Sequence, residues 1–346
     1  MDFMKINIFF NLKGGAWGGA NQFLKALKKK LAEKKAYEDN PNDSTTVIAN
    51  SYHELNDLIS FLIFKPDTFI IHRLGPIFYY HRGSAWRLYD KFIINFANKF
   101  ADGIIFQSAW SFEEAKKLGF EKEIEHAIIH NAPDCEIFNE HNKSNHKKDI
   151  KKFTIIATSN SDNLAKGFDY FDFLDKNLDF SKYRMIFVGR SPIKFENVIH
   201  IAPQDSKNLA KILNSGDLYL SPVKNEACSN AILEALTCGL PVLGLNNSSN
   251  PEIIGFGGEL FSNKKELIAK IEKIRNNYKS YQDAIKKPGL ENITNQYIGF
   301  INKIEKTKQP RKRNNFALLF CKINLFFIKN LVLILEKTAY NKKNAL

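Results

Sequence analysis

Short apolar runs alternate with amphipathic stretches along the first 130 residues of the chain. The apolar runs have the length of buried strands and lie at residues 5–11, 67–73, 102–108 and 127–131. Stretches with a helical spacing of apolar residues lie among them, at residues 21–35 and 112–118. Alternation of strands and helices is typical of a parallel, doubly wound α/β sheet. We therefore expect a Rossmann-like domain in this part of the chain.

The alternation starts again after a polar, charged stretch at residues 139–152, which we interpret as a linker. Predicted strands follow at residues 153–159, 182–190, 197–203, 217–223 and 241–245, with predicted helices at 168–176, 205–214 and 231–237. This second series predicts a second Rossmann-like domain. The pattern divides the chain into domains at residues 1–145 and 146–285, a closing helix at 286–308 and a tail at 309–346.

The tail contains an apolar stretch at residues 316–337 in which polar residues recur every seven positions, at Asn315, Lys322, Lys329 and Glu336. On a helix these residues form one narrow polar stripe, and nearly all other positions are apolar. The wide apolar face and the basic residues before it predict an amphipathic helix that binds an anionic membrane surface through residues 309–337. The alternative is that this helix docks on the protein's own surface or on a partner.

No stretch of 18 uncharged apolar residues occurs, so we expect no plain transmembrane helix. The first apolar run, at residues 5–11, is too short for a secretory signal. We therefore expect a cytoplasmic protein, bound peripherally to the inner face of the cytoplasmic membrane.

The net charge of +13 is concentrated in the last part of the chain. Residues 303–346 contain eleven Lys or Arg and two Glu, a charge of +9, which leaves only +4 for the rest. A nucleic-acid groove would need basic residues across its own domain, so nucleic acid is not an expected partner.

The four cysteines form no CxxC pair and no spaced set with histidine. We therefore expect no zinc or disulfide framework, and we expect the protein to lie in a reducing compartment. No Asp-x-Asp pair occupies a convincing loop at a strand end, so we expect no required metal ion and no cofactor.

The segment NEACSNAILEALTCGLPVLG, at residues 225–244, places two glutamates eight positions apart around the start of a predicted helix. Glu226 follows a predicted strand, at the edge of the sheet where doubly wound folds bind ligands. Glu234 lies about a turn and a half inside the helix, in an apolar stripe, and needs a partner such as a ribose hydroxyl. The alternative is a solvated glutamate on a surface helix.

Small residues surround the start of the same helix. Ser229 is a fair N-cap residue, and Asn230 and Ala231 begin the helix. Free backbone N–H groups at a helix start favour negative charge, so these three residues are candidates for binding a diphosphate.

This pattern, E-x7-E followed by EALTCGLPVL, resembles the donor-site signature of the retaining glycosyltransferases of family 4, which have the GT-B fold. The Cys-Ser-Asn-Ala variant resembles bacterial polysaccharide and lipopolysaccharide enzymes. The resemblance covers roughly residues 5–305. It implies an α/β architecture of two Rossmann-like, doubly wound domains that face a cleft. It also implies that Glu226 contacts the donor sugar and Glu234 the nucleotide ribose.

A second motif, SNSDNLAKGFDYF, follows the first strand of the second domain. Its Lys-Gly pair resembles the phosphate-binding lysine of the family, which makes Lys166 a candidate. A fixed cation suits a leaving diphosphate, which gains negative charge in the transition state. Many relatives have an arginine a few residues earlier, where this chain has only small polar residues. Arg190 could compensate, and the alternative for Lys166 is a solvated surface lysine.

The glycine-rich stretch KGGAWGGANQFLKAL follows the first strand and opens a helix. It does not match the G-x-G-x-x-G fingerprint, but closely spaced glycines still allow a ligand to approach the backbone. In the family a Gly-Gly pair at this place faces the donor phosphates, so Gly18 and Gly19 are candidates. The alternative is a flexible turn.

The stretch IIHRLGPIFYYHRGS ends a strand of the first domain and resembles a His-Arg-Leu-Asp-Gly-Pro run of the family without its acidic residue. We expect His72 to act in catalysis, and Arg73 and His81 to bind the acceptor. The alternative is a structural role for these side chains.

The sequence therefore predicts a glycosyltransferase that moves a sugar, with retention, from a nucleoside diphosphate sugar to a glycan or lipid-linked acceptor in cell-surface polysaccharide synthesis. Glu226, Lys166 and His72 are the expected catalytic residues. One alternative is a GT-B-fold epimerase or hydrolase of nucleotide sugars, and another is a non-catalytic module that binds nucleotide sugars.

Overall fold

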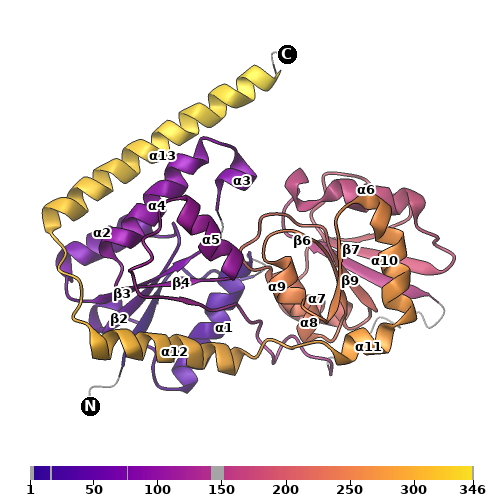
Figure 1. Ribbon diagram of the computed structural model, residues 1–346, viewed down its shortest axis with the longest axis horizontal. Coiled ribbons are helices and arrows are strands. Elements are labelled where there is room, and N and C mark those ends of the chain that lie inside the picture. Colours follow the sequence, from indigo (N-terminus) through magenta and orange to yellow (C-terminus); the bar gives the residue numbers. More distant parts are fainter. Residues whose placement is uncertain (1–3, 16–17, 76, 142–151, 345–346) are drawn as a thin grey trace. The chain divides into compact units, whose positions relative to one another are not determined.

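The computed structural model describes residues 4–15, 18–75, 77–141 and 152–344, which fold into two compact α/β units (Figure 1). The first unit comprises Met1–Asn11, Leu27–His130 and Thr294–Leu346, and the second comprises Leu12–Ala26 and Asn131–Ile293. Each unit is thus assembled from separate stretches of chain. Most of the predicted linker, at residues 142–151, lies outside the described residues, and so does the expected domain boundary.

The first unit contains a parallel sheet with the strand order β1-β2-β3-β4-β5. Its strands are β1 (Ile6–Phe9), β2 (Thr46–Asn50), β3 (Phe69–Leu74), β4 (Gly103–Phe106) and β5 (His126–Ile128). The four strands predicted in this part of the chain are confirmed, with shorter bounds. Strand β2 was not predicted, because its apolar core is only three residues long and follows the polar run at residues 42–45.

The first sheet is doubly wound around β1. Helix α1 (Gly19–Glu33) leads from β1 to Tyr37, which forms an isolated parallel bridge with Ile6. On the other side of β1, Ile6 pairs with Thr46 of β2. The chain therefore crosses from one side of β1 to the other and then winds in the opposite direction, which is the arrangement expected of a Rossmann-like domain.

Helices cover both faces of the first sheet. On one face, α2 (Leu55–Phe64), α4 (Trp86–Phe100) and α5 (Ala109–Lys117) share a core with residues of β2, β3 and β4, and the short α3 (Tyr79–Arg82) precedes α4. On the other face, α12 (Leu290–Thr307) packs against β4 (Figure 1). Gly103 makes this approach possible, because a Cβ there would lie 3.0 Å from the Phe300 ring. The predicted closing helix therefore completes the core of the first unit.

The second unit contains a parallel sheet with the strand order β11-β10-β9-β6-β7-β8. Its strands are β6 (Phe153–Ser159), β7 (Tyr183–Gly189), β8 (Ile199–Ile201), β9 (Leu218–Ser221), β10 (Val242–Leu245) and β11 (Gly258–Phe261). The chain winds outward from β6 to β8, returns to β9 beside β6, and winds outward the other way. This order confirms a doubly wound fold, with a topological switch point between β6 and β9.

Alternate residues of the second sheet enter two separate cores. Ile155 and Ala157 of β6 face a core shared with α6 (Phe168–Asn177) and α10 (Lys264–Asn276). Ile156 faces the opposite core, shared with α7 (Ser206–Leu213) and α8 (Asn230–Thr237). This period of two is what a strand with helices on both faces requires. The short helices α9 (Asn250–Ile254) and α11 (Tyr278–Asp283) complete the unit.

A buried arginine, Arg313, attaches the tail of the chain to the first unit. The Arg313 guanidinium donates to the carbonyls of Pro66, Thr68 and Phe100 and lies 2.5 Å from Asp102 Oδ2, with both charged side chains essentially inaccessible. Burial lowers the pKa of Arg313, and the Asp102 carboxylate opposes this effect.

The neighbouring Arg311 is also held by the first unit, since its guanidinium donates to the carbonyl of Asn98 at 2.7 Å. These contacts correct the expectation that the whole basic run is free to meet lipid. Arg311 and Arg313 anchor the tail, and Lys312 between them is exposed.

Helix α13 (Asn315–Asn344) then packs on α2 and α4 through a narrow apolar seam (Figure 1). Leu318, Leu325 and Val332 are buried in this seam, and Cys321 and Ile328 lie half-buried beside them. The alternating spacing of three and four residues keeps these side chains on one side of the helix. The tail helix therefore docks on the protein's own surface, as the alternative in the sequence analysis stated.

Helix α13 also bears on the expectation that no plain transmembrane helix is present. Asn315–Thr338 includes an 18-residue window of mean hydropathy 2.0, and it is the one helix in the described part of the chain that is long and apolar enough to cross a membrane. Lys322 and Lys329 interrupt the apolar run, but two charges do not lower its hydropathy enough to exclude a span. One such helix is weak evidence, because helices that pack on soluble proteins can pass the same test.

We expect Arg313→Ala to destabilise the first unit strongly. The substitution leaves the Asp102 carboxylate buried without its cation, which costs about 3–5 kcal/mol. Lys303→Ala is the matched control, because Lys303 forms an exposed pair with Glu125 in the same unit and such pairs contribute about 0–1 kcal/mol. Urea unfolding followed by the fluorescence of Trp86 and Trp110 measures both effects. Equal losses in the two variants would contradict the anchoring role of Arg313.

Candidate functional site

The strand order of the second unit brings Lys166 and Glu226 together. Lys166 ends a short 3-10 helix, Leu164–Lys166, after β6, and Glu226 lies in the loop after β9. Because β6 and β9 are neighbours at the switch point, the loops that leave their carboxyl ends are adjacent. Lys166 Nζ donates to Glu226 Oε1, and the two side chains are 28% and 22% exposed. The structure thus pairs two residues that the sequence analysis had selected separately.

Gly167 positions Lys166. Its φ of 84° lies in the left-handed region, and a Cβ at this position would lie 2.7 Å from Pro222 in the loop after β9. Only glycine meets both demands without strain. The Lys-Gly pair of the motif therefore has a structural reason: glycine lets the loop that carries Lys166 pack directly against the loop that carries Glu226.

The loop of Glu226 is held from the other side by a polar run that sequence reasoning missed, residues 247–250. Asn247 Oδ1 accepts from the N–H of Asn225, whose φ is 58°, and Ser248 Oγ accepts from the N–H of Glu226 at 3.2 Å. Ser249 Oγ donates to the carbonyl of Glu226 at 2.8 Å. The run follows β10 at the same sheet edge, so a sequence signal was present. We call Lys166, Glu226 and residues 247–250 the switch-point cluster.

Helix α8 begins close to the cluster, with Ser229 at its N-cap as predicted. The Ser229 side chain forms no capping hydrogen bond, although its carbonyl accepts from Leu233. Asn230 Oδ1 accepts from Asn131 Nδ2 at 2.9 Å, which fixes the amide at the first helical position. Ala231, with its small side chain, is partly accessible. A helix start of this kind suits a bound anion.

The glycine-rich stretch also reaches the start of α8, within the second unit. A Cβ on Gly19 would overlap the end of the Asn230 side chain, so glycine at this position leaves room for the Asn230 amide beside the first turn of α1. Gly18 has open space around it. Asn21, which sequence reasoning missed, holds the preceding loop by exchanging hydrogen bonds with the backbone of Lys13. Residues 16 and 17 of this stretch lie outside the described residues.

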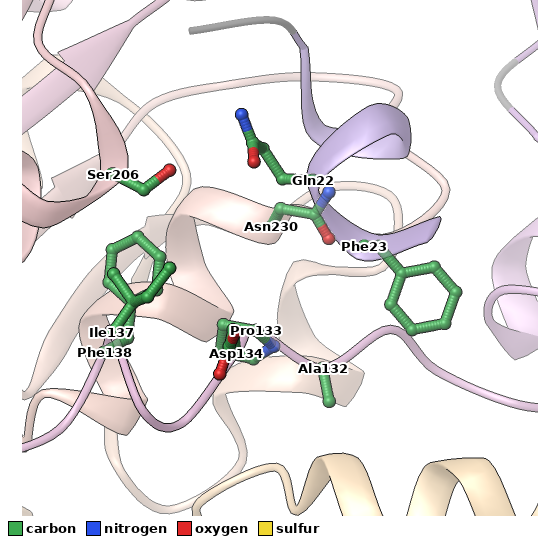
Figure 2. Close-up of a pocket in the computed structure, with 9 residues that line it drawn as sticks. All are labelled: Gln22, Phe23, Ala132, Pro133, Asp134, Ile137, Phe138, Ser206 and Asn230. Atoms are coloured by element: carbon green, nitrogen blue, oxygen red, sulfur yellow. The ribbon is translucent and has the colours of Figure 1, made fainter. Parts of the chain in front are cut away.

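A small pocket opens beside this approach (Figure 2). Gln22 and Phe23 come from α1, Asn230 begins α8 and Ser206 begins α7. The segment that follows Asn131 forms the rest of the wall, with Ala132, Pro133, Asp134, Ile137 and Phe138. The pocket is therefore lined by two helix starts and a carboxylate, next to the predicted diphosphate-binding residues.

Glu234 lies farther along α8, as predicted, and is half-buried among apolar side chains. Burial raises the pKa of its carboxyl to about 8, so this group is largely protonated at neutral pH. The electrostatic neighbours of Glu234 include Tyr219 and Cys238, and neither supplies a positive charge. The environment fits a polar partner that arrives with a ligand.

Arg190 follows β7 at the same sheet edge, and its side chain is exposed. Its N–H donates to the carbonyl of Ser159 at 2.9 Å. Gly189 has a φ of 128°, and a Cβ there would overlap the same carbonyl. The backbone places Arg190 next to the end of β6, but no described contact joins its guanidinium to the switch-point cluster.

His72 and Arg73 lie in the first unit, where both side chains are fully buried, at 0% and 1% exposure. A His72 ring nitrogen, Nε2, contacts the Ser51 carbonyl at 2.8 Å, and Arg73 donates to the side chains of Asn50 and Gln107. Burial lowers the pKa of His72 to about 4. Both side chains are thus held inside the first unit, which suits the structural alternative, and their roles in catalysis and acceptor binding stay predictions.

His81 lies in α3 and is half-buried, so it remains a candidate for acceptor binding. Residue 76, in the loop before it, lies outside the described residues. In the parts of the chain that the structure describes, no group of three or more His, Cys, Asp or Glu side chains could hold a metal ion.

We expect Gly167→Ala to destabilise the second unit by about 1–3 kcal/mol, because alanine is strained at a left-handed φ and its Cβ would meet Pro222. Gly299→Ala is the control: Gly299 is exposed within α12 with open space around it, and alanine there should stabilise by roughly 0.5–1 kcal/mol. Urea unfolding measures both variants. A neutral effect at position 167 would contradict the role assigned to its glycine.

Glu234→Gln should change how stability depends on pH. The pKa of about 8 in the folded protein exceeds the ordinary value of 4.5, so the folded state holds a proton that the unfolded chain releases. The stability this proton gives is full below pH 4.5 and is lost as pH rises through about 8. Glutamine stays neutral, so the melting temperature of the variant minus that of the parent should grow by roughly 5 °C or more from pH 5 to pH 9. A constant difference across this pH range would contradict the apolar setting of Glu234.

The site lies in a segment with a recognisable family pattern. Residues 141–288 match the family described as "Glycosyl transferases group 1". A stretch of 113 residues is 32% identical to an "Uncharacterized 41.2 kDa protein in cps region" of Klebsiella pneumoniae. That match spans 31% of each chain, or about a third of the relative's length.

Solved structures share the fold over most of the chain. The structure of HepE of Anabaena in complex with UDP has a TM-score of 0.67 and 17% identity, covering 87% of this chain and 100% of that chain. The structure of WaaG, "a glycosyltransferase involved in lipopolysaccharide biosynthesis", has a TM-score of 0.61 and 16% identity, covering 86% of this chain and 99% of that one. The chain thus has the GT-B fold, and its residues 141–288 form a domain that matches the glycosyl transferases group 1 family.

Proposed function

We propose that the protein is a glycosyltransferase that moves a sugar, with retention of anomeric configuration, from a nucleoside diphosphate sugar to a glycan or lipid-linked acceptor. The observation that carries the proposal is the contact between Lys166 and Glu226 at the switch point of a domain that matches the glycosyl transferases group 1 family. It places a cation and a carboxylate where doubly wound folds bind nucleotides.

The pair suggests how a donor would be recognised. In the ligand-free protein the Lys166 ammonium and the Glu226 carboxylate neutralise each other. A diphosphate carries more negative charge than one carboxylate, so it competes for Lys166. Glu226 would then accept hydrogen bonds from sugar hydroxyls. One binding event thus supplies a counter-ion to the phosphates and an acceptor to the sugar.

The remaining residues of the second unit complete this arrangement. The start of α8, at Ser229 to Ala231, would bind the diphosphate through its backbone N–H groups, and Gly19 allows close approach beside it. Glu234 would meet the ribose, where a hydroxyl pair supplies the polar partner that its apolar setting lacks.

In the reaction, the bond between the anomeric carbon and the diphosphate oxygen breaks, and a bond to an acceptor hydroxyl oxygen forms. The hydroxyl proton is released, and the diphosphate leaves with the electron pair of the broken bond. Lys166 and the start of α8 would stabilise the charge that develops on this leaving group. Retention comes from the resemblance to family 4, as does the proposal that no metal ion or other cofactor is needed.

The context of the similar proteins supports the class of acceptor. One HepE structure contains UDP, and WaaG is described as acting in lipopolysaccharide biosynthesis. The Klebsiella pneumoniae relative is encoded in a cps region. We therefore propose a role in cell-surface polysaccharide synthesis.

Lys166→Ala and Glu226→Ala should each lower sugar transfer by about 10²–10³ in kcat, because each removes a group that acts on the reacting diphosphate or sugar. Transfer from a panel of UDP and GDP sugars to lipid-linked glycan acceptors, with EDTA present, measures this effect. Lys182→Ala is the matched control, because Lys182 forms an exposed pair with Asp179 just before β7, at the opposite edge of the sheet from the cluster.

Several outcomes would contradict the proposal. Full activity in Glu226→Ala would show that the site is assigned wrongly. Sugar release or isomerisation without an acceptor would identify an epimerase or hydrolase. Binding of the nucleotide sugar with no turnover on any acceptor would favour a non-catalytic binding module.

A further inference from the structure

The side of α13 that faces away from its seam is apolar along most of the helix. We call its exposed apolar residues the outer face. They are between 40% and 78% exposed, and they are Phe316, Leu319, Phe320, Ile323, Phe326, Phe327, Leu331, Leu333, Ile334 and Leu335. At 1.5 Å per residue the outer face is about 30 Å long. Soluble monomers rarely expose an apolar patch of this size, so a covering surface is expected.

The shape of the outer face favours a broad covering surface over a second helix. At about 100° per residue, its positions cover more than half of the helix circumference. A helix–helix contact uses only a narrow stripe, as the seam of α13 itself does. A partner helix would therefore leave several phenylalanines in water, whereas the boundary of a lipid bilayer covers the whole face.

Basic side chains border the outer face. Lys312 precedes α13 and is exposed, and Lys329 and Lys337 are exposed on the helix itself. On the α2 side, Lys322 Nζ donates to Ser60 Oγ at 2.7 Å. On the α4 side, the Lys99 ammonium lies close enough to the Cys321 thiol to lower its pKa, although burial raises that pKa to about 11. Ammonium groups at the edge of an apolar face can reach lipid phosphates while their stems stay in the apolar region.

The seam and the arginine anchor decide the orientation of α13. The helix is long enough to cross a bilayer, but Leu318, Leu325 and Val332 are buried against α2 and α4. Arg313 holds its start on the first unit through Asp102. A crossing helix would have to leave this core and expose both sides of the seam. A docked helix can present its outer face and keep the core intact.

We propose that α13 lies in the plane of an anionic lipid bilayer, with its outer face in the boundary between headgroups and acyl chains and its seam docked on the first unit. This inference goes beyond the proposed sugar transfer and does not depend on it. The partner is a membrane surface, recognised by apolar insertion together with attraction between lysines and lipid phosphates.

The test uses the full chain and flotation with vesicles of phosphatidylcholine, with or without 30 mol% phosphatidylglycerol (about a third anionic lipid). The protein should float with the anionic vesicles and bind neutral ones at least about tenfold more weakly. Phe327→Ser should lower binding to the anionic vesicles about tenfold, because a 63% exposed ring that would enter the bilayer is lost. Phe256→Ser is the matched control, since Phe256 is 82% exposed in the second unit, and it should bind like the parent.

Four results would overturn the inference. The first is equal binding by Phe327→Ser, Phe256→Ser and the parent. The second is the absence of binding to either vesicle. The third is a lipid-free dimer, seen by sedimentation, that Phe327→Ser dissociates, because a second copy would then cover the outer face. The fourth is resistance of the bound protein to alkaline carbonate, which would identify a crossing helix. Thermal melting shows that the variants are folded, and nucleotide binding by the second unit is measured in the same samples to keep the two proposals separate.

Discussion

The candidate site depends on one constraint, the pairing of β6 with β7 on one side and with β9 on the other. All three strands run in the same direction, so the loops after them leave the same edge of the sheet. The chain winds away from β6 in both directions, and the loops after β6 and β9 meet without a helix between them. Lys166 and Glu226 are sixty positions apart in the sequence and touch for this reason. The strand order brings the two loops together. The packing of Gly167 on Pro222 and the hydrogen bonds from residues 247–250 then fix the positions of Lys166 and Glu226 within them.

The two glutamates of the motif have opposite environments, although eight positions separate them. Glu226 lies in a loop, at the edge of solvent, with an ammonium partner. Glu234 lies inside a helix among apolar side chains, which raise the pKa of its carboxyl. The first group is paired with a cation, and the partial burial of the second raises its pKa to about 8. One short segment therefore offers a ligand both a charged acceptor and a neutral carboxyl group that can also donate.

The sequence predicted much of the fold, because period-two and period-3.6 patterns are local. It located nine of the strands and the loops that carry Lys166 and Glu226. It missed β2 and β11, whose apolar runs are short, and the role of Tyr37, which is a single bridging residue. It did not reveal that His72 and Arg73 are buried, because a strand end can point into the core as well as outward. It did not find the pairing of Arg313 with Asp102 or the seam of α13, because contacts between residues some two hundred positions apart leave no periodic signal.

The contribution of Thr294–Leu346 to the first unit has a consequence for protein synthesis. Domains near the start of a chain commonly fold while the rest is still being made. Here the β4 surface stays uncovered until α12 leaves the ribosome, and Asp102 has no guanidinium partner until Arg313 follows. The second unit, which ends at Ile293, has all of its chain available earlier. The first unit is therefore completed after the second, and until then it exposes an apolar sheet face and an unpaired carboxylate that a chaperone could recognise.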